Sequence, residues 1–206
     1  TQTADAGECD TAVTWAAPTT ADNCSAVMTS THSPGDSFEV GTTTVTYTSV
    51  DPSGNTTSLS FTVTVTDDED PAIAGNPGNL TQTADAGQCS ALVSWTAPTA
   101  TDNCAISTLT STHNSNDAFA VGTTTVTYTA TDIHGNSSTS TFNVTVTDDE
   151  DPTISDMPAN ITQTADAGVC NAVVTWADPT TDDNCAISTF TSTHNSGDTF
   201  NVGTTT

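Results

Sequence analysis

The sequence predicts an all-β protein made of tandem β-sandwich domains. Three observations support this fold class: β-branched residues alternate with other residues in short segments, turn residues separate these segments, and the pattern recurs about every 80 residues. Alternation of this kind is typical of strands with one buried face. The sequence shows no helical periodicity.

Composition alone would also fit a disordered chain. The 206 residues include 25 Asp and Glu but no Lys or Arg, so the formal net charge is -25 at pH 7, and bulky apolar residues are scarce. Such chains often bury too little apolar surface to fold. The charge excludes nucleic acid and anionic membrane surfaces as partners. No segment approaches the roughly 18 apolar residues of a membrane span, so we expect no membrane insertion.

Internal repeats favour a folded chain. T-Q-T-A-D-A-G-x-C begins at Thr1, Thr81 and Thr162, so the period is 80 and then 81 residues. D-N-C and F-x-V-G-T-T-T recur in step with it. Units of this size are domains and not solenoid repeats. We therefore expect three domains, at residues 1–70, 71–151 and 152–206.

The outer repeats are predicted to be incomplete. The sequence starts, at Thr1, after the beginning of the first expected strand. Thr206 corresponds to Thr44, so the third repeat lacks counterparts of residues 45–80. Two interpretations are open: the sequence is cut from a longer array, or an identical chain completes the open sandwich by strand addition. Neighbouring repeats, in the same or an identical chain, are the expected partners in both cases.

The complete second repeat predicts the order of its strands. Turn clusters, including one with Gly135 at an expected positive φ, separate six or seven short strands, which fits a β-sandwich. A linker of about 14 residues is expected between the strand that ends at Val146 and the next, near Ile161. We expect the tryptophans in the core; an exposed sugar-binding role is the alternative. The expected buried faces are Ala91, Val93 and Trp95, then Val126 and Tyr128, then Phe142, Val144 and Val146.

Six cysteines fall two per repeat and are always 15 residues apart. One pair per repeat, without any CxxC cluster, predicts a disulfide inside each repeat and an oxidising, extracellular or cell-surface location. Buried thiols are the alternative. A disulfide loop of this size contributes about 3 kcal/mol. The expected pairs are Cys9 with Cys24, Cys89 with Cys104, and Cys170 with Cys185.

Several ordered motifs resemble one known family. They are G-x-C-x-A-x-V-x-W at Gly87 to Trp95, D-N-C at Asp102 to Cys104, V-G-T-T-T-V-T-Y-T-A-T-D-x-x-G-N from Val121, and F-x-V-T-V-T-D-D-E-D-P from Phe142. Together they resemble the HYR (hyalin repeat) domain over the whole chain. The resemblance implies immunoglobulin-like sandwiches in an extended array, a role in adhesion or extracellular architecture, and no enzymatic activity. A second cysteine pair, frequent in that family, is absent here.

Two carboxylate runs at the repeat junctions are the main candidate site. With no Lys or Arg, their counter-charges must be cations from solvent, and Ca²⁺ suits them because it accepts six to eight oxygen ligands. A solvated acidic linker with diffuse counterions is the alternative. The candidate ligands are Asp67, Asp68, Glu69, Asp70, Asp148, Asp149, Glu150 and Asp151, completed by Asp22, Asp102 or Asp183 from the D-N-C triplets, or by Asp51 or Asp132 from hairpin turns.

Other motifs carry little chemistry. The sequence contains no G-x-S-x-G, H-E-x-x-H or P-loop motif, so we expect no enzyme. Histidines at equivalent positions, and His134 in a turn, are expected to be loop residues without chemistry. N-x-S/T sequons are about as frequent as chance predicts, so glycans are allowed but not indicated. These sequons begin at Asn23, Asn55, Asn79, Asn136, Asn143 and Asn160.

These observations predict a non-catalytic structural segment of a long extracellular protein. We expect a rod-like adhesin stalk or the protein strand of an extracellular filament, for which rigidification by Ca²⁺ and attached glycans are candidate additions. A carbohydrate-binding or protein-binding accessory module of a secreted enzyme is the alternative. Near-identical loops in the three copies and few aromatic residues favour the structural role.

Overall fold

The computed structural model describes residues 1 to 206 and contains eighteen strands without any helix, which confirms the all-β prediction. No helix long and apolar enough to cross a membrane is present. The chain divides into two compact units, and their boundary runs through the second repeat. Unit 1 comprises Thr1–Gly78, Trp95–Ser115 and Thr125–Phe142, and unit 2 comprises Asn79–Ser94, Asn116–Thr124 and Asn143–Thr206.

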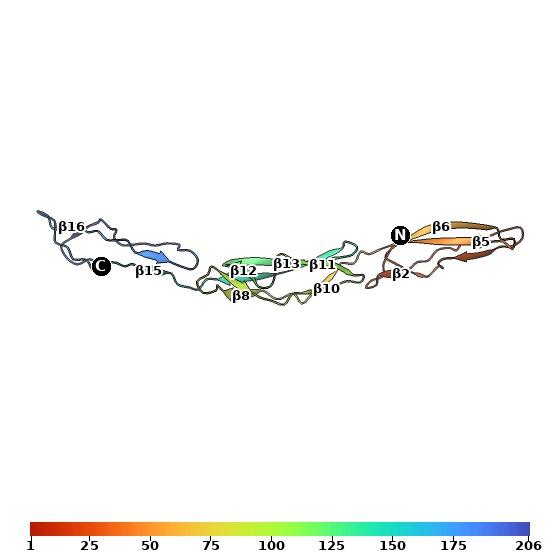
Figure 1. Ribbon diagram of the computed structural model, residues 1–206, viewed down its shortest axis with the longest axis horizontal. Coiled ribbons are helices and arrows are strands. Elements are labelled where there is room, and N and C mark those ends of the chain that lie inside the picture. Colours follow the sequence, from red (N-terminus) through yellow and green to blue (C-terminus); the bar gives the residue numbers. More distant parts are fainter. The chain divides into compact units, whose positions relative to one another are not determined.

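The first repeat lies in unit 1 and forms two sheets (Figure 1). Its strands are β1 (Gln2–Thr3), β2 (Asp10–Ala12), β3 (Val27–Ser30), β4 (Ser37–Glu39), β5 (Gly41–Val50) and β6 (Thr56–Thr66). One sheet has the order β1-β6-β5-β3, in which β1 runs parallel to β6 and the other pairs are antiparallel. The second sheet is the antiparallel pair of β2 and β4.

A long hairpin of β5 and β6 supports the larger sheet. Its turn is closed by the Asp51 carboxylate, which accepts hydrogen bonds from the Asn55 backbone N–H at 2.8 Å and from Asn55 Nδ2 at 2.7 Å. Gly54 adopts a φ of 88°, a conformation that favours glycine. The hydrogen bond from the Asn55 side chain, followed by the backbone hydrogen bond from Asn55, holds the pKa of Asp51 below its ordinary value.

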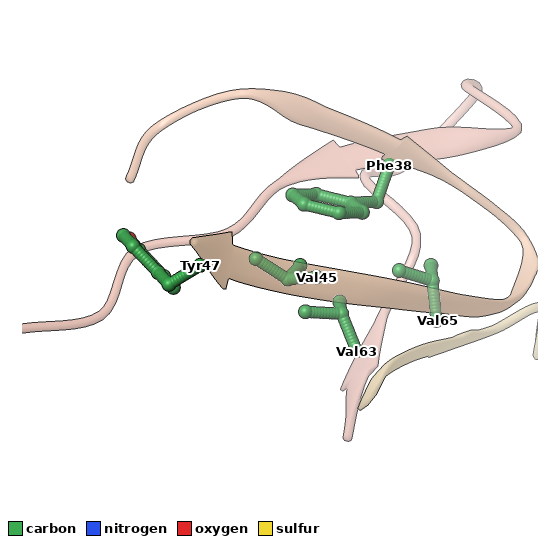
Figure 2. Packing of buried hydrophobic residues seen from close by; sticks show 5 residues of the cluster. All are labelled: Phe38, Val45, Tyr47, Val63 and Val65. Atoms are coloured by element: carbon green, nitrogen blue, oxygen red, sulfur yellow. The ribbon is translucent and has the colours of Figure 1, made fainter. Parts of the chain in front are cut away.

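Apolar side chains of β4, β5 and β6 form the core of the first repeat, as Figure 2 shows. The Trp15 ring packs edge-on against Phe38, with centroids 5.9 Å apart, and its Nε1–H donates to the Tyr47 hydroxyl at 2.8 Å. Trp15 is half-buried against this core, as expected for a structural tryptophan. The buried cluster consists of Phe38, Val45, Tyr47, Val63 and Val65.

The second repeat contains more strands than the six or seven expected. Its elements are β7 (Ala72–Ala74), β8 (Leu80–Thr83), β9 (Ser90–Val93), β10 (Thr99–Thr101), β11 (Ile106–Ser111), β12 (Asp117–Ala120), β13 (Gly122–Asp132) and β14 (Ser137–Thr147). The sheets have the orders β10-β7, β12-β9 and β11-β13-β14-β8. Apart from Trp95, which follows β9 and is half-buried, every side chain expected on a buried face is buried.

The third repeat, in unit 2, forms two short antiparallel pairs: β15 (Thr153–Ser155) with β17 (Thr180–Asp182), and β16 (Asn171–Val173) with β18 (Thr199–Asn201). β15 falls inside the linker of about 14 residues, and Ile161 lies in no strand, so that linker prediction was wrong. The acidic residues and the proline before β15 are typical of a linker, so the sequence did not predict this strand. β15 forms by pairing with β17. A groove of about 690 Å³ in this repeat is lined partly by Met157, Ile161, Trp176 and Phe200.

Candidate functional site at the repeat junctions

Disulfides join neighbouring repeats and do not close loops within them. Cys9 of the first repeat is bonded to Cys104 of the second, across 95 residues of chain. Cys89 of the second repeat is bonded to Cys185 of the third, across 96 residues. Cys24 and Cys170 are exposed thiols. The predicted pairing inside each repeat was therefore wrong.

The D-N-C triplet holds the second cysteine of each pair in a local turn. The Asp102 carboxylate accepts the backbone N–H of Cys104 at 3.0 Å, and Asp183 accepts that of Cys185 at 3.1 Å. These local bonds shape a turn whose cysteine meets the first cysteine of the preceding repeat. The constant spacing of cysteines fits pairing within a repeat and pairing between neighbouring repeats equally well, because every repeat carries one first and one second cysteine.

Cleavage after glutamate distinguishes the two pairings. The only glutamates are Glu8, Glu39, Glu69 and Glu150, so digestion separates the peptides 9–39, 40–69, 70–150 and 151–206. We expect a denaturing, non-reducing digest to keep three of these, 9–39, 70–150 and 151–206, in one covalent species. Alkylation before digestion should label Cys24 and Cys170 in the mass spectrum. Pairing inside each repeat would instead release the three peptides separately.

Asparagines of the D-N-C triplets bridge both junctions in the same way. Asn103 Nδ2 donates to the Glu8 carbonyl oxygen at 2.9 Å and to Asp67 Oδ1 at 3.2 Å. In the second junction, Asn184 Nδ2 donates to the Gln88 carbonyl oxygen at 2.9 Å and to Asp148 Oδ1 at 3.1 Å. Each disulfide is thus flanked by the same pair of hydrogen bonds. These asparagines were not among the predicted site residues, although their recurrence in every triplet was a signal.

The residues of each acidic run have different partners. Glu69 Oε2 accepts the Gly7 N–H at 2.8 Å, and Glu150 Oε2 accepts the Gly87 N–H at 3.0 Å. Asp70 Oδ1 accepts the Ser137 N–H at 3.2 Å. The side chains of these runs therefore do not converge on one point. Apart from Asp67, all residues of the two runs are exposed: Asp68, Glu69, Asp70, Asp148, Asp149, Glu150 and Asp151.

The first junction instead gathers three carboxylates from different segments. One oxygen each of Asp67, Asp102 and Asp132 lies within 4.8 Å of the others. The Asp67 side chain has no exposed surface, and Asp132 is only 2% exposed. Asp102 Oδ1 is buried without a hydrogen-bond partner. Three carboxylates so close together repel one another strongly in a chain that has no Lys or Arg.

The Asp132 carboxylate is held in its charged form. Burial raises its pKa, but hydrogen bonds from Asn136 Nδ2 and from the backbone N–H groups of Gly135, Asn136 and His134 outweigh this effect. The pKa of Asp132 consequently lies below its ordinary value. The negative charge of this buried group thus persists at neutral pH.

His134 lies in the turn between β13 and β14, as expected, and it also contacts the acidic run of the first junction. Its Nδ1 lies 3.0 Å from Asp67 Oδ2. The Cys104 sulfur also lies within 4.8 Å of ligand atoms of Asp67 and His134. It is already in a disulfide and so does not offer a thiolate to a metal ion. The His32 and His194 rings lie tilted against Phe38 and Phe200, respectively, with centroids 5.0 Å apart.

The sequons differ in accessibility. Asn136 is half-buried, and its Nδ2 donates to Asp132 Oδ2 at 2.7 Å and to the Asp67 carbonyl oxygen at 3.3 Å. A glycan on that nitrogen would remove a donor from the junction. Asn143 is also half-buried, within β14. The exposed sequon asparagines are Asn23, Asn55, Asn79 and Asn160.

A groove of about 330 Å³ opens in the first repeat. Trp15, Leu59 and Phe61 line it together with Met28 and Tyr47. Phe61 is 39% exposed there, whereas its counterpart Phe142 in the second repeat is only 4% exposed. The second repeat differs in having β7, which pairs with β10, and Asn76 Nδ2, which donates to the Thr141 carbonyl oxygen.

Comparison with known proteins assigns the family. The HYR domain model matches residues 1–65, 66–146 and 147–206. The chain is 39% identical over 206 residues to a protein named hyalin from Lytechinus variegatus, and 37% identical over 210 residues to one from Strongylocentrotus purpuratus. These alignments cover 97% and 98% of this chain but only 39% and 18% of the relatives. The three family matches cover the whole chain, which therefore belongs to the HYR domain family.

Proposed function

We propose that this segment is a non-catalytic structural part of an extracellular adhesion-type protein. The observation that carries the proposal is the repeated junction, in which a disulfide and two asparagine hydrogen bonds link neighbouring repeats. Covalent junctions restrict motion between domains, and disulfides persist in oxidising, extracellular settings. The hyalin relatives support the same class of protein.

A rod-like stalk or a filament strand is the specific form that we propose. The near-identical repeats and their cross-linked junctions support it, because restricted junctions make a chain of domains stiff. Electron microscopy of the purified chain with and without Ca²⁺ tests the two versions. Helical fibres would support the filament, and dispersed monomers at every Ca²⁺ concentration would contradict it.

We further propose that Ca²⁺ occupies the carboxylate cluster of the first junction. The residues fit a hard cation: Asp67, Asp102 and Asp132 offer three carboxylates, and the buried Asn103 Oδ1 has no hydrogen-bond partner. Ca²⁺ prefers such oxygen ligands. The ion would neutralise the mutual repulsion of the carboxylates and so stabilise the junction.

Calcium addition should therefore raise the melting temperature of the chain. Ligand at about 100 times its dissociation constant stabilises a folded protein by about 2.7 kcal/mol. Calorimetric titration should show Ca²⁺-dependent heat that Asp67→Asn abolishes. The control is Asp68→Asn, an equal change of charge at an exposed neighbouring position. Absence of heat and of any thermal shift, or equal weakening by both variants, would refute the site.

Glycans are proposed only for the exposed sequons, and the intact mass of native material tests them. The alternative function as a binding module draws on the groove beside Trp15. Phe61 lines this groove, and its counterpart Phe142 in the second repeat is buried by protein. The groove therefore fits contact with another protein segment better than contact with sugar.

A further inference from the structure

We propose that the Cys24 face of the first repeat is a covalent docking site for the end of another HYR repeat. The bond would join Cys24 to a cysteine in the position of Cys9. The two internal junctions support this assignment, because both counterparts of Cys24, namely Cys104 and Cys185, bond to the first cysteine of the preceding repeat. This inference goes beyond the proposed function and does not depend on Ca²⁺.

The Cys24 face already has the local geometry of the occupied faces. Asp22 Oδ2 accepts the Cys24 backbone N–H at 2.9 Å, as Asp102 and Asp183 do for their cysteines. The Cys24 thiol is exposed, and so is the neighbouring Asn23, whose counterparts Asn103 and Asn184 bind the preceding repeat. The site therefore needs no rearrangement of its triplet before a partner binds.

The carboxylate turn beside this face is also formed in advance. Asp51 and Asn55 make the same hydrogen bonds as Asp132 and Asn136, at 2.7 and 2.8 Å. Asp132 is buried, with the Asp67 segment against its turn, whereas Asp51 is half-buried. This difference in burial identifies the surface around Asp51 as the counterpart of the surface that the Asp67 segment covers in the second repeat.

The neighbouring apolar groove points to the same occupant. Leu59 and Phe61 are 78% and 39% exposed in the first repeat. Residues 19–21, the counterpart of β10, form no strand, whereas β10 pairs with β7. An occupant with a first-position cysteine, an acidic run and a short strand like β7 would satisfy the cysteine, the turn and the groove together.

Bond formation needs an oxidant, for which we name a low-molecular-weight disulfide such as oxidised glutathione. The thiolate of one cysteine attacks this disulfide, forms a mixed disulfide and releases one glutathione thiolate. The second cysteine thiolate then attacks the mixed disulfide at the protein sulfur and releases the other. Two protein thiols are oxidised, one glutathione disulfide is reduced, and the two thiol protons end on two glutathione molecules.

An extended chain tests the proposal directly. Residues 1–80 are placed ahead of Thr1, which recreates the natural sequence from Leu80 to Gly87 at the seam. In the added copy, Cys24→Ser leaves one new cysteine. After oxidation, we expect alkylation to label only Cys170, and a non-reducing digest to show the added Cys9 bonded to the original Cys24. Intact Cys9–Cys104 and Cys89–Cys185 bonds serve as the internal test of folding.

The matched control also carries Cys9→Ser in the added copy and should show labelled Cys24 and Cys170. Labelling of the added Cys9, the original Cys24 and Cys170 in the test chain would overturn the proposal.

A second experiment does not depend on folding of the extended chain. The natural chain carrying Cys24→Ser is mixed with the chain carrying Cys170→Ser in a glutathione redox buffer. The first variant retains the free Cys170, the first cysteine of its repeat, and the other retains the free Cys24, the second cysteine of its repeat. We expect about tenfold more disulfide dimer in the mixture than in either variant alone, since only the mixture combines the two kinds. Equal dimer formation in all three samples, or none in the mixture, would count against the docking site.

Discussion

Replacing Cys9 and Cys104 together by serine is expected to lower the free energy of unfolding by about 4 to 5 kcal/mol, because loops of about 100 residues lose the most entropy on cross-linking. The bond closes a loop across 95 residues, far longer than the one expected within a repeat. Urea unfolding followed by tryptophan fluorescence measures the loss.

The matched control is Cys24→Ser, which removes an exposed thiol and should leave stability unchanged. If Cys24→Ser itself lowered stability by several kcal/mol, Cys24 would be in a disulfide, as in the pairing inside each repeat. A loss below about 1 kcal/mol in the double variant would show that the junction bond contributes little to folding.

Phe38→Ala should destabilise the first repeat by about 3 to 5 kcal/mol, the usual range for removing a buried aromatic ring. The Phe38 ring lies over the valines of the core (Figure 2). It is 3% exposed and packs against both Trp15 and His32. Its loss would leave a cavity that the surrounding strands can fill only in part. Urea unfolding gives the change in stability, and near-ultraviolet circular dichroism reports the environment of the three tryptophans, of which Trp15 contacts Phe38.

Leu59→Ala provides the comparison for Phe38→Ala. Leu59 is 78% exposed, so its truncation should change stability by no more than about 0.5 kcal/mol. Similar losses from both substitutions would mean that the first repeat does not have the core described here.

Local patterns predicted most of the sandwich. The alternation in β13 and β14 identified Val126, Tyr128 and Phe142 as buried, because strand side chains alternate between two faces. The short strands β7 and β15 were missed. Both follow an acidic run and a proline, which resemble a linker, and both form by pairing with a later strand of the same repeat.

The junctions required information that local sequence does not contain. Spacing could not show which cysteine Cys104 would meet, since that depends on how two repeats abut. The acidic run suggested a site, yet only Asp67 joins Asp102 and Asp132, and His134 reaches Asp67 from the turn that begins at Asp132. The recurrence of D-N-C marked the triplet as important without indicating that its asparagine binds across the junction.

The staggered disulfides give the chain a redundant covalent path. The closed ring from Cys9 to Cys104 overlaps the ring from Cys89 to Cys185, so every peptide bond between residues 9 and 185 lies inside at least one ring. A single backbone cut anywhere in that range would leave all fragments attached. Nicking by a protease or rupture of one peptide bond would thus not sever the molecule, and tension would pass through the cystine on the other side of the ring.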